Sequence, residues 1–152
     1  MVRNRIVRAL ATAAALASMV GVLAVAQPAQ AFTSSSSITV SGNTFWVKAW
    51  SCNVYFTSCS WDAEATSTFT RTFTHRGDVK ANGINVSVTI SAAPSVTITG
   101  NSTPMATATR TVTATSNFMS GQANPSIFSV SVAARSRLTS GSTSIDSGWT
   151  TW

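Results

Sequence analysis

The sequence predicts an all-β protein, and three observations lead to this prediction. Apolar and polar residues alternate with period two along most of the chain after residue 31, which is typical of strands. Valine, isoleucine and threonine, which favour strands, dominate these runs. Gly, Asn, Pro and Ser separate the runs at regular intervals, and no helical stretch supplies a crossover between parallel strands. We therefore expect an antiparallel β-sandwich of seven or eight strands with immunoglobulin-like architecture, and a closed barrel is the alternative.

The first 31 residues have the features of a secretory signal peptide. Three arginines begin it, an apolar alanine-rich run follows from Ala9 to Ala26, and residues 29–31 (Ala-Gln-Ala) form a small-x-small cleavage site. The run resembles the leaders of high-GC Gram-positive bacteria. A membrane anchor is the alternative, because the run approaches the length that spans a bilayer. Pro28 and the cleavage site favour removal, so we expect residues 32–152 to be one secreted, extracellular domain.

Composition excludes several classes of protein. Charged residues make up 9% of the chain, against roughly 25% in an average globular domain. Three of the ten basic residues belong to the leader, so the mature chain keeps seven basic and four acidic residues, a net charge of +3. We therefore expect no nucleic-acid partner. One histidine and two cysteines are too few for a multi-ligand metal centre, so we expect no cofactor.

The first half of the mature chain is expected to hold two strands and then a longer third one. Residues 32–37 are expected to be a polar and loosely held N-terminal segment, and residues 38–40 are expected to form a short strand. A Ser-Gly-Asn turn at 41–43 connects this strand to the alternating residues 44–51. The longer strand covers residues 61–75, where apolar residues on one face alternate with threonines on the other.

Turn residues interrupt the pattern after this long strand. Residues 76–78 (Arg-Gly-Asp) and residues 81–83 (Ala-Asn-Gly) are both expected to be turns, because Gly, Asp and Asn favour turn conformations. Four β-branched residues then alternate between positions 84 and 90 and predict the strongest inward-facing strand. Residues 92–94, which end in proline, break this strand.

The C-terminal part continues the alternation of strands and loops. Its inward faces are expected to include Phe128, Val130, Val132 and Ala134. The expected elements are a short strand at 96–98, a loop at 100–104, a strand at 105–115, a loop at 117–125, a strand at 128–138, a turn at 140–142 and a closing segment at 143–152.

The two cysteines are expected to form a disulfide. Cys52 and Cys59 both lie in the exported part, and cysteines of secreted proteins usually pair. A bond between them would close the short loop of residues 53–58 and stabilise the fold by roughly 2.5 kcal/mol in the chain-entropy model.

The aromatic residues around these cysteines are the candidate binding site. If Phe45 and Val47 are core residues, the alternating Trp46 and Trp50 face outward. Exposed aromatic rings at this spacing can stack on sugars or anchor a protein partner. The alternative is that the tryptophans are themselves core residues. The candidate binding residues are Trp46, Trp50, Tyr55, Phe56 and Trp61.

No catalytic set is expected. His75 is the only histidine, and it is expected to face solvent at a strand end, because no nucleophile motif frames any serine. Asp62 and Glu64 share one strand face, about 7 Å apart by strand rise. They are expected to be solvated surface acids rather than a glycosidase pair.

Three functions stay open at the level of sequence. The preferred one is a secreted, non-enzymatic protein that binds another secreted or cell-surface protein through its aromatic loop or by strand addition. Such a protein would be an adaptor subunit of an exported toxin or surface complex, or a hydrolase inhibitor. The second is a carbohydrate-binding module that uses its tryptophans on a polysaccharide. The third is a secreted membrane-acting toxin, because threonine–apolar alternation is also typical of barrel strands.

Overall fold

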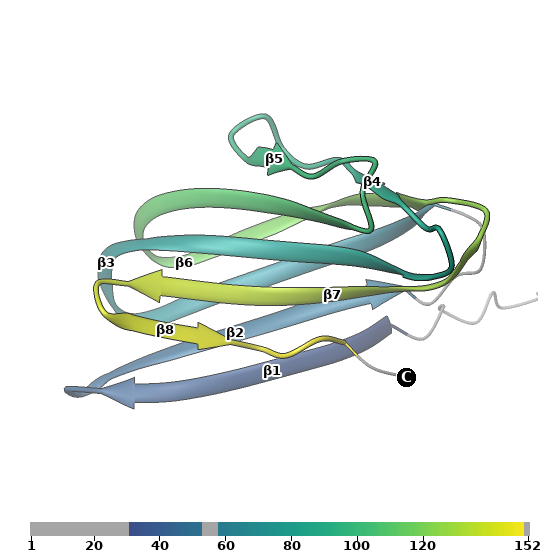
Figure 1. Cartoon of the computed structure of the whole chain (residues 1–152). Coiled ribbons are helices and arrows are strands. Elements are labelled where there is room, and N and C mark those ends of the chain that lie inside the picture. The colour runs from purple at the N-terminus through teal and green to yellow at the C-terminus, as the bar shows by residue number, and fades with distance from the viewer. Residues whose placement is uncertain (1–30, 53–57, 151–152) are drawn as a thin grey trace, which may run out of the picture.

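The computed structural model describes residues 31–52 and 58–150, and every element in these ranges is a β-strand (Figure 1). The strands form one antiparallel sheet, so the prediction of an all-β antiparallel protein with seven or eight strands is confirmed. The eight strands are β1 (Ala31–Val40), β2 (Asn43–Cys52), β3 (Cys59–Gly83), β4 (Val88–Ile90), β5 (Thr97–Thr99), β6 (Met105–Pro125), β7 (Ser129–Ser140) and β8 (Thr143–Asp146).

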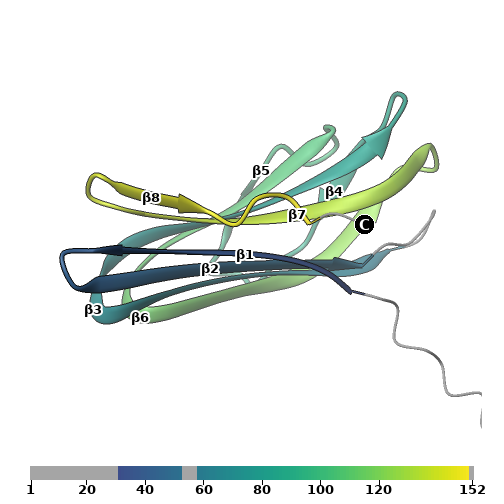
Figure 2. The same cartoon turned by 90° about the horizontal axis from the view of Figure 1, so that it is seen from below.

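The long strands β3 and β6 organise the whole sheet. They pair from Cys59↔Ala123 to Lys80↔Met105, and the pairing is irregular between Thr66 and Arg71. The first half of β3 also pairs with β2, which pairs with β1, whereas the second half pairs with β7, which pairs with β8. Figure 2 shows the result as two layers, one with β1 and β2 and the other with β7 and β8. The two layers are therefore parts of one folded sheet that share β3 and β6.

The core lies between the two layers and explains why the strands alternate. Trp61 and Ala63 from the first half of β3 belong to the same buried cluster as Val79 and Ala81 from its second half. A smaller cluster around Phe45 fills the other end. Alanine supplies many inward positions, so little side-chain volume separates the layers. At the open edge, the Ser34 hydroxyl donates to the carbonyl of Ser147 and fastens β1 to the segment after β8.

The tripeptide at residues 76–78 lies inside β3, so the predicted turn there is wrong. A Cβ atom on Gly77 would lie 2.9 Å from Cζ3 of Trp61 and 3.2 Å from Cβ of Ala63. Glycine is needed here because the two halves of β3 pack closely against each other. The residues at 81–83 likewise continue β3 to its end instead of forming a separate turn.

Two segments predicted to be irregular are strands. Residues 32–37 belong to β1 and pair along their whole length with β2, so they are not a loosely held segment. Residues 117–125 belong to β6, where Asn117 and Met119 are buried against β3. Polar and small residues are tolerated in both segments because a neighbouring strand satisfies their backbone groups. The predicted turn at 41–43 is confirmed in its first two residues, Ser41 and Gly42, which have positive φ angles of 51° and 75°.

The predicted inward faces of two strands need correction. Between residues 84 and 90, only Val88 and Ile90 are buried, and Ile84 is 81% exposed. Phe128, which directly precedes β7, and Val130 in β7 are exposed, whereas Val132 and Ala134 are buried as predicted. The register of β7 against β3 shifts between Asn82 and Gly83, so that Ser129 and Ser131 take the paired positions and Val130 is bulged outward. A bulge of this kind changes which face a side chain occupies.

Candidate functional site

The structure describes three of the five candidate binding residues, and it places them in two different situations. Trp46 and Trp50 lie on the outward side of β2 and are partly exposed, opposite in direction to the buried Phe45. Trp61 is fully buried, so it is a core residue rather than an exposed binding side chain. Its indole Nε1 donates to the carbonyl of Ser91 at 3.2 Å, which satisfies the one polar group of the ring. Tyr55 and Phe56 lie outside the described residues.

The outward side of β2 continues across two further strands as one surface. We call this surface the tryptophan face and define it by the residues Trp46, Lys48, Trp50, Asp62, Glu64 and Phe118. The ammonium group of Lys48 lies 4.4 Å from the ring centroid of Trp50 and 5.9 Å from that of Trp46, which is cation–π geometry. Phe118, which is 55% exposed, meets Trp50 edge-on with ring centroids 6.3 Å apart.

Strand register positions the charged groups of the tryptophan face. Lys48 lies opposite Glu64, and Glu64 lies opposite Phe118 on β6. Trp50 lies opposite Asp62. Since neighbouring strands are about 4.8 Å apart, both carboxylates lie between the tryptophans of β2 and Phe118. Both are partly buried, and burial raises the pKa of the Asp62 carboxyl above its ordinary value.

The predicted disulfide would join the last residue of β2 to the first residue of β3. Cys59 is buried, and its thiol is not free. The side chain of Cys52 lies outside the described residues, so the pairing of Cys52 with Cys59 stays a prediction.

His75 is fully buried between the layers, so the prediction that it faces solvent is wrong. The Asn117 amide nitrogen lies 2.7 Å from its Nδ1, and the Ser136 hydroxyl lies 2.9 Å from its Nε2. The Ser136 hydroxyl in turn donates to the carbonyl of Glu64 at 2.8 Å. Burial lowers the pKa of His75 to about 3, so the ring is neutral at pH 7.

The order of donors in this network fixes the role of the ring. Because the Asn117 amide donates to Nδ1, the proton of the neutral imidazole is on Nε2 and is donated to Ser136. A general base must instead accept the serine proton. Here the serine proton goes to the backbone carbonyl of Glu64. The network therefore satisfies buried polar groups between the two layers.

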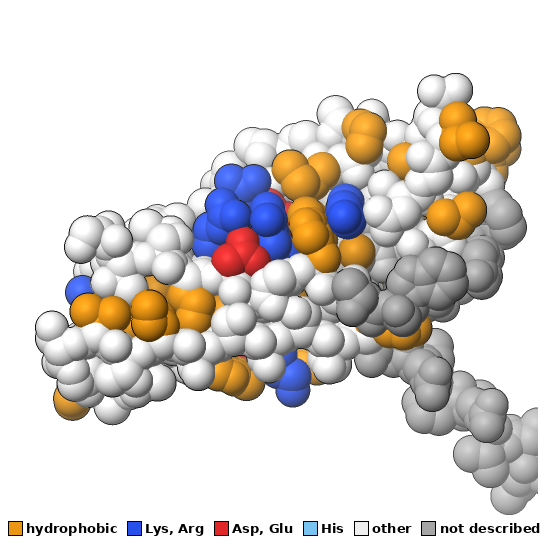
Figure 3. Space-filling view, turned by 60° about the horizontal axis from the view of Figure 1, so that its bottom comes forward, with side chains coloured by type: hydrophobic (Ala, Val, Ile, Leu, Met, Phe, Trp, Pro, Cys, Tyr) orange, Lys and Arg blue, Asp and Glu red, His pale blue; other side chains and the backbone are white. Residues whose placement is uncertain are grey.

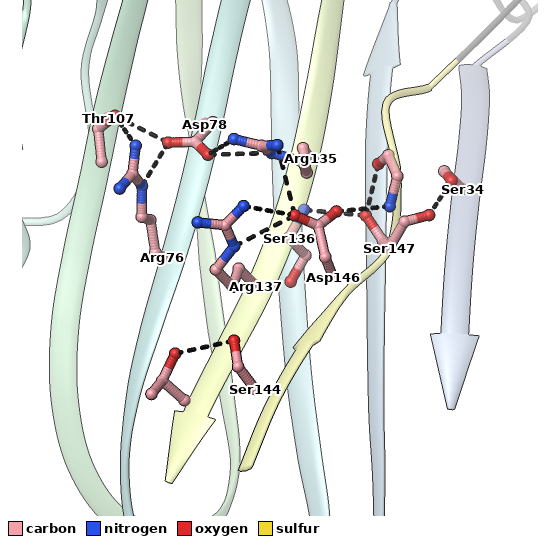
Figure 4. A network of polar contacts seen from close by, with 12 residues as sticks. Ser34, Arg76, Asp78, Thr107, Arg135, Ser136, Arg137, Ser144, Asp146 and Ser147 are labelled. Atoms are coloured by element: carbon pink, nitrogen blue, oxygen red, sulfur yellow. Dashed lines mark hydrogen bonds and ion pairs between the residues drawn. The ribbon is translucent and has the colours of Figure 1, made fainter. Parts of the chain in front are cut away.

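A second polar network covers the outer side of the layer that contains β7 and β8. Asp78 is fully buried and accepts from Arg76 at 2.6 Å, from Arg135 at 2.6 Å and from the Thr107 hydroxyl at 2.8 Å (Figure 4). Burial by itself would raise the pKa of Asp78, but these three hydrogen-bond donors outweigh it and hold the pKa below its ordinary value.

Asp146 extends this network to the edge strand β8. It accepts from Arg137 at 2.8 Å, and Nη1 of Arg135 lies 3.4 Å away. Trp149 packs beside the network. Its ring centroid lies 4.4 Å from the ammonium nitrogen of Lys80 and 4.5 Å from the central guanidinium carbon of Arg135. The cations gather in one patch of this face of the molecule (Figure 3). We call it the arginine patch, and its members are Arg76, Asp78, Lys80, Arg135, Arg137, Asp146 and Trp149.

Sequence reasoning missed the arginine patch, although a signal for it was present. Arg76, Asp78 and Lys80 follow Thr72 and Thr74 at intervals of two residues, and thus continue the polar face of the same strand. Reading residues 76–78 as a turn interrupted that alternation and concealed the patch.

An apolar surface lies at the end of the molecule where β3 and β7 meet. Ile84 and Phe128, together with Val130, are exposed there and line a cavity of about 390 Å³ with Gly83 and Asn85. A Cβ atom on Gly83 would lie 2.4 Å from the carbonyl oxygen of Phe128, so the close approach of these two segments requires glycine.

Within residues 31–52 and 58–150, no group of three or more His, Cys, Asp or Glu side chains is arranged to hold a metal ion. In the same part of the chain, no helix is long and apolar enough to cross a membrane. No protein-family model, no curated protein sequence and no solved structure matches the chain.

Proposed function

We propose that this chain is an exported, non-enzymatic binding protein that recognises another secreted or cell-surface protein through the tryptophan face. The features of residues 1–31, of which residues 1–30 lie outside the described part of the chain, support export. We also infer that the two layers form a β-sandwich of immunoglobulin-like type, built here from one sheet that folds over itself rather than from two separate sheets.

The observation that carries the proposal is the aromatic surface formed by Trp46, Trp50 and Phe118 on the outer side of a rigid sheet. The rings lie on β2 and β6, with β3 between these strands, and those of Trp50 and Phe118 already contact each other. Less side-chain entropy is therefore lost when a partner covers them. Tryptophan is among the residues that contribute most to protein interfaces. Lys48 and Glu64 lie among the rings and supply the charged groups that orient a partner.

The buried position of His75 supports a binding role over a catalytic one. The ring is enclosed between the layers, and both of its nitrogens are occupied by hydrogen bonds. A general acid or base must reach a substrate proton, and none of the six residues of the tryptophan face is a histidine.

Alanine substitutions on the tryptophan face test the proposal. Trp50→Ala and Phe118→Ala are each expected to reduce recovery of the partner from culture medium about tenfold, the effect of ~1.4 kcal/mol of binding energy. Phe128→Ala, which changes an exposed aromatic residue outside the tryptophan face, is the matched control and should change nothing. Circular dichroism of each variant checks that the fold is kept. Unchanged recovery with folded variants would contradict the proposal.

A carbohydrate ligand is the second candidate, because both carboxylates of the tryptophan face lie directly beside its rings. Aromatic rings can stack on sugar faces, and neighbouring carboxylates can accept hydrogen bonds from sugar hydroxyls. A panel of soluble glycans would then change the fluorescence of Trp46 and Trp50, and insoluble polysaccharide would retain the protein. Absence of both effects would remove this candidate and leave the protein partner.

A further inference from the structure

The arginine patch has chemistry that the tryptophan face lacks. We propose that the guanidinium groups of Arg76 and Arg137 bind a tetrahedral oxyanion, such as a phosphate or sulfate group, on the outer side of the layer that contains β7 and β8. This site goes beyond the proposed function and lies on the other layer from the tryptophan face.

The first argument is that the two arginines lie directly opposite each other on paired strands. Arg76 of β3 is the register partner of Arg137 of β7. Directly opposed side chains in an antiparallel pair have Cβ atoms about 5 Å apart, and like charges at this position destabilise the sheet. Asp78 and Asp146 offset part of this repulsion, and an anion placed between the two guanidinium groups would offset more of it.

The second argument is that each guanidinium is held in place while part of its donor set stays unused. Nε of Arg76 bonds Asp78, and its Nη2 bonds Thr107 at 3.3 Å. Nε and Nη2 of Arg137 both bond Asp146. Among the described residues, neither Nη1 group makes a hydrogen bond. The side chains are 37% and 34% exposed, so these donors are accessible.

The third argument is local charge. The arginine patch contains four cations and two carboxylates, a net charge of +2, on a chain that has few charged residues. Asp78 is fully buried beneath Arg76 and Arg135, so its charge is screened from the surface by the guanidinium groups. Thr109, which is the register partner of Arg76 on the other side, supplies a neighbouring hydroxyl.

The geometry of the donors points to an oxyanion rather than to a simple halide. Guanidinium groups present planar pairs of N–H donors that match two oxygens of phosphate or sulfate. Two such groups from neighbouring strands can bond different oxygens of one tetrahedral anion. Their existing ion pairs hold them in place, so the entropy lost on binding is small.

Titration of the purified protein with inorganic phosphate at pH 7, followed by NMR of the arginine Nε–H groups, tests the site. We expect the Arg76 and Arg137 signals to shift and to saturate, while the Trp46 and Trp50 indole signals stay in place. Sodium chloride at matched ionic strength should produce neither the shift nor the saturation of the arginine signals. A linear shift without saturation, or the same shift with chloride, would overturn the proposal.

Two substitutions separate a built site from general attraction to positive charge. Arg137→Gln should weaken phosphate binding at least tenfold, and Arg137→Lys should weaken it several-fold, because lysine keeps the charge and loses the planar fork. Lys48→Gln, which removes the same charge from the tryptophan face, is the control and should leave phosphate binding unchanged. Full affinity in Arg137→Lys, or equal losses in Lys48→Gln, would show that no oriented site exists. Thermal unfolding of each variant checks that the fold is intact.

Discussion

At the scale of single residues, His75 and Asp78 show how burial decides what a polar side chain does. Both belong to β3, and both are fully buried, but on opposite sides of the strand. His75 is neutral and joins the layers through hydrogen bonds. Asp78 keeps its charge because two arginines and a threonine donate to it. Each residue therefore leads to a separate prediction about stability.

The lowered pKa of His75 predicts that the protein loses stability in mild acid. Its folded pKa is about 3 and its ordinary value is 6.5, so between these pH values the unfolded chain binds the extra proton. The free energy of unfolding should then fall as pH decreases through this window, by at most about 1.4 kcal/mol per pH unit. Urea unfolding at several pH values between 7 and 4 measures the slope, and a flat profile would contradict the prediction.

A His75→Gln variant is the control for this pH dependence. Glutamine keeps hydrogen-bonding groups but does not titrate. The variant should be less stable than the wild type at pH 7 and should lose most of the slope above pH 4. The carboxyl of Asp78, whose folded pKa is below its ordinary value of 3.8, contributes to the slope only at lower pH.

Asp78→Asn is expected to destabilise the protein strongly. The substitution removes the charge of the buried carboxylate that bonds both Arg76 and Arg135, and leaves Arg135 only its 3.4 Å contact with Asp146. Breaking a buried pair costs about 3–5 kcal/mol. Asp146→Asn is the matched control, because Asp146 is 32% exposed and its ion pairs are screened by solvent. We expect that control to lose less than about 1 kcal/mol. Equal losses in the two variants, measured by urea unfolding at pH 7, would contradict this account.

At the scale of elements, the fold depends on the bending of β3 and β6. Their pairing is irregular between Thr66 and Arg71, and beyond this point the neighbour of β3 changes from β2 to β7. A bulge bends a strand and increases its twist. The bend lets one pair of strands contribute to both layers, and the inner side of the bend is filled by side chains such as Trp61 and Ala63.

Gly77→Ala tests the close packing of the two halves of β3. The added methyl group would lie within 3.2 Å of both Trp61 and Ala63, and overpacking of this kind costs about 1–3 kcal/mol. Thr72→Ala, on the exposed side of the same strand, should change stability by less than about 0.5 kcal/mol. Thermal and urea unfolding compare the two variants. A neutral Gly77→Ala would mean that the halves of β3 are not in contact at this point.

The connection between β2 and β3 leads to a prediction about the cysteines. If Cys52 pairs with Cys59, the unreduced and denatured protein should resist alkylation, and the reduced protein should take up two labels in mass spectrometry. Reduction should lower the free energy of unfolding by roughly 2.5 kcal/mol. Alkylation of the unreduced, denatured protein would contradict the pairing.

At the scale of the whole molecule, the folded sheet separates two surfaces of different chemistry. The tryptophan face lies on the outer side of the layer with β1 and β2, and the arginine patch lies on the outer side of the layer with β7 and β8. Because the core separates them, substitutions on the tryptophan face should leave phosphate binding unchanged, and Arg137→Gln should leave partner binding unchanged.

The alternation of residues was enough to predict the all-β class, the strand β2, and that Trp46 and Trp50 share the face opposite Phe45 and Val47. Period two follows from the geometry of a single strand, so it can be read without knowing the rest of the fold. The turn at Ser41 and Gly42 was predictable for the same reason, since a two-residue turn depends on local conformation alone.

The burial of Trp61, His75 and Asp78 and the role of Gly77 follow instead from contacts between distant parts of the chain. Alternation says on which side of a strand a residue lies, but it does not say what covers that side. Trp61 and Gly77 meet because β3 folds over itself, and Asp78 keeps its charge because Arg135 comes from another strand. Such contacts are created by the bend and the register of the sheet, and neither is encoded in the pattern of any one segment.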